Sequence, residues 1–218
     1  MAGIGFELKK IIDKDKIFAQ ARVYFMSSLI TVGPMIICIT LFLVMQRLLK
    51  NLGASYANIQ IFNAVIIYSF LISYISSNGI SMLMSRYISD CIYAKKSGCI
   101  FESFLGVSII FSIISTIIMS LLLINSPLNL IIKSICFMIT IILSLIWLEI
   151  IYLSAIKEYL HIVSFFLIGI SIVILGTILG IDFLNIPPIY SALLFSLAGY
   201  IFIAISFMVL LYKVFGIK

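Results

Sequence analysis

Six long stretches of almost uninterrupted apolar residues constrain the fold of this chain more than any other feature. A bilayer core about 30 Å thick is crossed by roughly 20 apolar residues in a helix, because no water is present there to pair with open backbone groups. Hydrophobic residues make up 64% of the 218 residues and charged residues only 10%, unlike soluble domains. The sequence therefore predicts an all-α integral membrane protein. Its six transmembrane helices are expected at about 23–45, 59–84, 104–124, 134–156, 162–181 and 189–212.

The basic residues predict how these spans are oriented. Of the 14 Lys and Arg residues, eleven lie in alternate gaps: five before the first span, three in residues 86–101, one at Lys157 and two after the last span. The opposite gaps hold Arg47, Lys50 and Lys133. Cytoplasmic loops carry an excess of Lys and Arg, so both termini are expected in the cytoplasm. The expected domains are a basic N-terminal segment 1–22, a six-helix lobe 23–212 and a cytoplasmic tail 213–218.

The net charge of +6 belongs mostly to the predicted cytoplasmic face, where anionic lipid attracts basic residues. No nucleic-acid-binding motif accompanies this charge, so membrane lipid is its expected partner. Cys38 and Cys136 lie in predicted spans, and Cys91 and Cys99 lie in a predicted cytoplasmic loop, so no disulfide framework is expected. These cysteines and the single histidine, His161, have no metal-site spacing, and the sequence implies no cofactor.

A row of serines runs along the second predicted span. Two interpretations stay open: a seam of small residues that lets another helix approach closely, or a polar wall of a wet cavity for a hydroxyl-rich substrate. We favour packing for the serines as a group, keep Ser73 and Ser77 as candidates for the cavity wall, and expect Asn78 to face water. The row, with a spacing of four, is Ser69, Ser73, Ser77, Ser81 and Ser85.

Small residues elsewhere predict close contacts between helices. The fifth predicted span carries Gly176 and Gly180 in a GxxxG spacing, which is typical of a packing seam. The third predicted span repeats the serine pattern, and we expect a seam there too. Its members are Ser108, Ser112, Thr116 and Ser120.

The pair Gly33-Pro34 lies in the middle of the first predicted span. Proline removes a backbone donor and clashes with the preceding turn, so a kink or an unwound segment is expected there. The pair is a candidate hinge for gating, and a static bend is the equally open alternative.

Glu149 is the one acidic residue well inside a predicted span. A carboxylate in the membrane is costly unless it is paired, faces water or takes a proton. One hypothesis makes Glu149 a protonatable coupling site or a contact for a cationic substrate. The alternative is a carboxylate near the interface, reached by water and shielded by Trp147 and Tyr152, whose hydroxyl is the only hydrogen-bond donor nearby on the helix.

Three segments resemble the Pel exopolysaccharide transporter family (PelG). The opening Met1–Lys10, MAGIGFELKK, is similar to the start of that family, and Ser85–Tyr93 resembles its (T/S)RYxxDxxY pattern at the end of the second span. Trp147 with Leu153–Tyr159 resembles the exit of its fourth span, and Gly33-Pro34 falls where the family has a Gly-Pro kink.

The resemblance implies membership of the multidrug/oligosaccharidyl-lipid/polysaccharide flippase superfamily, in which two six-helix lobes enclose a cavity and alternate access across the bacterial inner membrane. It also makes Arg86 and Asp90 family-pattern residues at the predicted cytoplasmic end. In addition, their spacing allows an (i, i+4) ion pair. Glu149 does not carry over. Family members have about twelve spans, so this chain corresponds to the first lobe of a 6+6 transporter. Two interpretations stay open: a half-transporter that a second lobe completes, or a fragment of a longer transporter.

The expected function is therefore non-enzymatic: the first lobe of an exporter that moves amino-sugar polymer across the inner membrane. The expected partners are membrane lipid, the polysaccharide, a second six-helix lobe from another copy or a separate chain, a cytoplasmic glycosyltransferase and other Pel assembly proteins. Two alternatives stay open: a cation-coupled exporter of small drugs, which needs an embedded acid such as Glu149, and a non-transporting subunit that anchors a glycosyltransferase.

Overall fold

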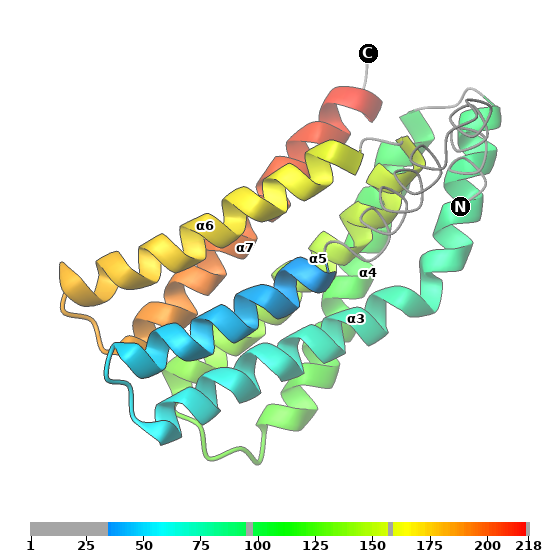
Figure 1. Ribbon diagram of the computed structural model, residues 1–218. Coiled ribbons are helices and arrows are strands. Elements are labelled where there is room, and N and C mark those ends of the chain that lie inside the picture. Colours follow the sequence, from blue (N-terminus) through cyan, green and yellow to red (C-terminus); the bar gives the residue numbers. More distant parts are fainter. Residues whose placement is uncertain (1–34, 95–97, 157–158, 217–218) are drawn as a thin grey trace, which may run out of the picture.

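A computed structural model describes residues 35–94, 98–156 and 159–216, and all regular secondary structure in these ranges is helical (Figure 1). The prediction of an all-α chain is confirmed for this part of the sequence. The helices are residues 35–51, α3 (Tyr56–Tyr93), α4 (Gly98–Leu123), α5 (Leu130–Ile156), α6 (Tyr159–Asp182) and α7 (Pro188–Phe215).

Five of the described helices, α3 to α7, are long and apolar enough to cross a membrane. The helix over residues 35–51 covers the second half of the first predicted span and continues six residues past it. Gly33 and Pro34 lie outside the described residues, as does the basic segment 1–22. The candidate hinge therefore stays a prediction.

Local residues explain where α3 and α7 begin. The Ser55 side chain accepts a hydrogen bond from the Asn58 amide at the start of α3, which satisfies one of the open N–H groups of the first turn. Gly53 precedes it with a φ of +75°, a conformation that glycine adopts without strain. Pro188 opens α7, where its missing N–H costs nothing.

Helix α5 is the centre of the bundle. It packs against α3, α4 and α7, and 56% of its membrane-length segment is buried, compared with 33% or less for each other candidate span. Figure 1 shows α3 on one side of α5 and the α6–α7 pair on another. A side chain on α5 can therefore lie inside the lobe, while most of α4 faces outward.

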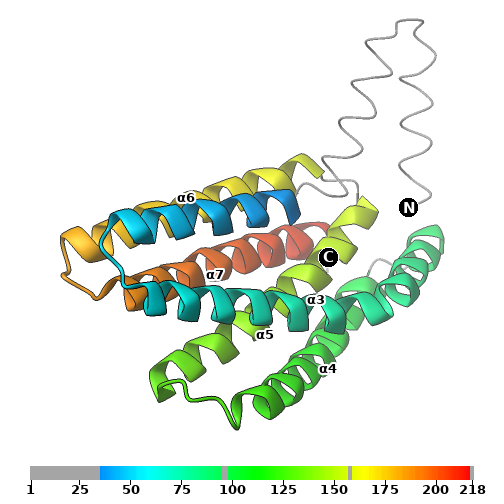
Figure 2. The same cartoon turned by 60° about the horizontal axis from the view of Figure 1, so that its bottom comes forward.

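Helix α3 is 38 residues long, about 57 Å at 1.5 Å per residue, which exceeds the thickness of a bilayer core. It changes direction partway along, so that its last part runs beside α4 (Figures 1 and 2). Serine hydroxyls along α3 donate to carbonyls of the preceding turn, as Ser76 does to Ile72 at 2.8 Å and Ser81 to Asn78 at 2.9 Å. Hydrogen bonds of this kind are a common cause of helix bending.

The seam predicted from Gly176 and Gly180 is confirmed. A Cβ atom at Gly176 would collide with the Phe195 ring of α7, and one at Gly180 would collide with Ser191 and Phe195. Gly199 on α7 lies equally close to the α6 backbone: a Cβ there would be 2.8 Å from the Gly169 carbonyl oxygen. Helices α6 and α7 therefore approach each other as closely as their backbones allow.

The serine row of α4 lies beside its buried stripe rather than in it. Ser108, Ser112, Thr116 and Ser120 are half-buried, and each hydroxyl donates to a carbonyl of its own helix. The buried stripe consists instead of Ile100, Phe104, Phe111, Ser115, Met119 and Leu123. Hydroxyls that bond their own backbone can face either protein or lipid, so the spacing alone could not place this row.

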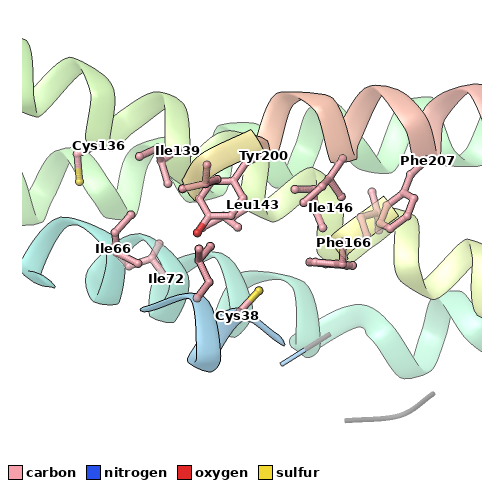
Figure 3. Close-up of a cluster of buried hydrophobic side chains, with 14 of the residues drawn as sticks. Cys38, Ile66, Ile72, Cys136, Ile139, Leu143, Ile146, Phe166, Tyr200 and Phe207 are labelled. Atoms are coloured by element: carbon pink, nitrogen blue, oxygen red, sulfur yellow. The ribbon is translucent and has the colours of Figure 1, made fainter. Parts of the chain in front are cut away.

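Apolar side chains from α5, α6 and α7 interlock inside the lobe (Figure 3). Leu143 and Ile146 of α5 lie with Phe166 of α6 and with Tyr200 and Phe207 of α7, and all five are buried. Lipid tails are as apolar as these side chains, so the contact is held by close packing and dispersion. A void or a steric clash in this contact therefore lowers the stability of the lobe.

We predict that Gly176→Ala destabilises the lobe by about 1–3 kcal/mol, because the new methyl group overpacks against Phe195. The matched control is Gly106→Ala on α4, where a Cβ meets no atom within 4 Å and the change removes a flexible glycine from a helix. Thermal unfolding in detergent measures both. Equal melting temperatures for the two variants would contradict the described seam.

Candidate functional site

The inner side of α3 is joined to α5 by buried polar and aromatic contacts. The Trp147 indole N–H donates to Ser73 Oγ at 3.2 Å, and the rings of Phe70 and Tyr74 meet the Trp147 ring edge-on at 5.2 and 5.4 Å. One turn before Ser73 along α3, Ser69 Oγ donates to the Cys136 carbonyl at 3.4 Å. We call these residues the α3–α5 seam.

Ser73 and Ser77, two of the predicted cavity candidates, are buried, at 0% and 2% exposure. Ser73 lies in the α3–α5 seam, and Ser77 donates to the Tyr74 carbonyl of its own helix at 3.1 Å. Neither side chain lines an open surface of the described lobe. Their positions favour the packing interpretation of the serine row.

The outer side of α3 is different. Asn78 is exposed, and its amide N–H donates to the Tyr74 carbonyl at 3.1 Å. Around it on the same face are large side chains with open surface. We call Tyr68, Leu71, Tyr74, Ile75, Asn78 and Met82 the outer strip of α3; its large apolar and aromatic members are 43–84% exposed. This strip places one amide and two tyrosines within an apolar, membrane-length helix.

An apolar groove of about 310 Å³ runs beside the outer strip, between the helix over residues 35–51, α3 and α7. Tyr74 belongs to both, and Asn78 lies one helical turn further along α3. Sequence patterns could not predict this groove, because its walls come from three helices, two of which are far apart in the chain. Its lining includes Met35, Cys38, Phe42, Ile66, Phe70, Leu71, Ser196 and Tyr200.

Glu149 lies inside the lobe, with only 3% of its surface exposed. The other charged residues of the described part are exposed, except half-buried Lys133. Among the described residues, its Oε2 atom has no hydrogen-bond partner. Tyr152, the donor that the sequence offers, is engaged elsewhere: its hydroxyl bonds with Ser103 Oγ at 3.1 Å and lies 3.5 Å from Met84 Sδ.

Arg86 and Asp90 are both exposed near the end of α3, and the structure of the described residues shows no ion pair between them. Water solvates both charges there, so the pairing would contribute little. Their place fits an anchor at the predicted cytoplasmic interface.

A comparison with protein families matches the whole sequence, residues 1–218, to the PelG family, described as "Putative exopolysaccharide Exporter (EPS-E)". No curated protein and no solved structure matches the chain.

We predict that Ser73→Ala lowers the stability of the lobe by about 1–3 kcal/mol, because the buried indole N–H of Trp147 loses its acceptor. Ser85→Ala is the control: the Ser85 hydroxyl bonds only the Met82 carbonyl of its own helix. Unfolding in detergent, followed by tryptophan fluorescence, reports on the single Trp. A Ser85→Ala variant that unfolds as early as Ser73→Ala would argue against the seam.

Proposed function

Because the chain belongs to the PelG exopolysaccharide exporter family, we propose that it forms one six-helix lobe of an exporter that carries polysaccharide outward across a bacterial cytoplasmic membrane. The observation that carries this proposal is the outer strip of α3 with the adjoining groove. It is an open surface at membrane depth that combines an amide with aromatic rings.

An exposed amide is poorly placed against lipid, because hydrocarbon offers it no hydrogen bonds. It is well placed beside a wet path. Sugars present hydroxyl groups to an amide and flat apolar faces to tyrosine rings. Asn78 would therefore contact hydroxyl groups of the polymer, while Tyr68 and Tyr74 offer faces for the rings to slide along.

The outer strip also suggests where a second lobe would lie. A lobe with an even number of spans leaves the chain on the side where it entered, so two such lobes share one orientation around an axis along the membrane normal. A second lobe would face the strip and the groove and close the path between them. Movement of the two lobes relative to each other would give alternating access, and Gly33-Pro34 is the proposed hinge.

The basic residues would keep both termini and the loop around residues 95–97 in the cytoplasm. A glycosyltransferase that makes the polymer would dock at this end, near Arg86 and Asp90, and deliver its product to the path. The chain itself supplies passage rather than chemistry.

We predict that Asn78→Leu reduces secreted polymer several-fold, because it removes the amide of the outer strip while keeping a helix-forming side chain of similar size. The measurement is the amount of extracellular polysaccharide from cells that lack the native gene and carry the variant, at equal levels of protein in the membrane.

The matched control is Ser171→Leu, which removes an exposed polar group from α6, on the other side of the lobe, where the hydroxyl bonds only the Leu167 carbonyl. Its export should equal that of the unchanged protein. Normal export with Asn78→Leu, or equal losses in both variants, would refute the assignment of the path to α3.

A further inference from the structure

Glu149 faces the wedge where α4 and α7 meet around α5. Successive helical residues are 100° apart, so Glu149 lies about 200° around α5 from Trp147, which contacts α3. On one side of it, Tyr152 meets Phe104 of α4. On the other side, Ile146 is buried in the same apolar cluster as Phe207 of α7 (Figure 3). The carboxyl group is therefore directed into the lobe, away from the outer strip of α3.

A chain of aromatic rings closes this wedge at the predicted cytoplasmic end. Phe104 meets Tyr152 at 5.3 Å and Phe101 at 6.3 Å, and Phe101 meets Tyr212 of α7 at 5.7 Å. We call these four residues the aromatic closure. Tyr152 follows Glu149 by three residues, about 4.5 Å of helical rise. The rings therefore lie between the carboxyl group and the end of the bundle.

Among the described residues, no charged side chain of the helices around α5 is buried beside Glu149. Each such residue is exposed, and the closure itself contributes only the hydroxyls of Tyr152 and Tyr212. A carboxylate without a partner is unstable in this wedge, whereas the neutral acid is tolerated. The charged or titratable side chains concerned are Glu102 on α4, Lys213 on α7, Arg86 and Asp90 on α3, and His161 and Asp182 on α6.

We infer that Glu149 is a proton-binding site that is loaded while the wedge is closed and emptied when it opens. A metal cation would need several oxygen ligands, but Oε2 has no partner, and the described residues contain no group of three His, Cys, Asp or Glu side chains that could hold a metal. A proton needs the carboxyl group alone. Separation of the aromatic closure would admit water, through which the proton leaves as the carboxylate becomes hydrated.

Proton binding would then favour the closed arrangement of the lobe, and proton loss the open one. The link to transport rests on the function proposed above, whereas the proton site itself does not. Because Glu149 and the outer strip of α3 lie on different sides of α5, the proton and the polymer would occupy separate places in the same lobe.

The test is modification of the purified full chain in lipid nanodiscs by dicyclohexylcarbodiimide. This apolar reagent adds to a protonated carboxyl group, whose proton moves to nitrogen, and the product rearranges to a stable N-acylurea without loss of atoms. Peptide mass spectrometry of the unchanged protein locates the adduct, so the result does not depend on a variant that folds. We expect the adduct at Glu149, with a rate that falls about tenfold or more between about pH 6 and about pH 9.

Glu102→Gln, which changes the exposed acid of α4, is expected to leave the rate unchanged, and Glu149→Gln to abolish the adduct. Three results would overturn the inference. A rate independent of pH would indicate an acid that is permanently protonated, and absence of an adduct at Glu149 in folded protein would indicate a carboxylate. Protection by sodium at constant pH would indicate a metal cation. The reaction needs no polymer, so its failure is separate from a failure of the export experiment.

Discussion

Every part of this structure depends on the absence of water from the bilayer core. Backbone groups must be paired within helices, so the described chain is helical throughout its membrane-length segments. Lipid tails compete with apolar side chains on equal terms, so the helices are held by close packing. Glycines bring α6 and α7 together at Gly176 and Gly199, and α5 is surrounded on three sides. The result is a lobe with a packed interior and a long, bent α3 at its edge.

Because water is absent from the bilayer core, the surroundings of each polar group within a membrane-length helix indicate its role. Ser73 is paired with Trp147 and serves packing. Asn78 is exposed, which favours contact with water, substrate or a second lobe over contact with lipid. Glu149 is buried and Oε2 is unpartnered, which favours a neutral acid that can take up and release a proton. One lobe would thus offer a surface for sugars and, inside it, a separate site for a proton.

Much of this was predictable from the sequence, and the limits have physical reasons. Apolar length predicted the helices, and the GxxxG spacing predicted the α6–α7 seam, because both are local signals. The burial of Glu149 needed the position of α5 in the bundle, since a lone acid near a span end can also be reached by water. Likewise, a spacing of four did not distinguish Ser73 in a seam from Asn78 on an open face. The groove and the aromatic closure join residues distant in sequence, and periodicity does not report such contacts.

In the proposed exporter, the outer strip of α3 faces a water-filled path rather than lipid. Cysteine accessibility in membranes distinguishes these two environments, in a chain whose four native cysteines are replaced by serine. We expect a water-soluble maleimide to modify Asn78→Cys readily and Ser171→Cys, on the exposed face of α6, slowly or not at all. If Asn78→Cys reacts no faster than Ser171→Cys, α3 does not border a water-filled path, and the proposed export path along its outer strip is contradicted.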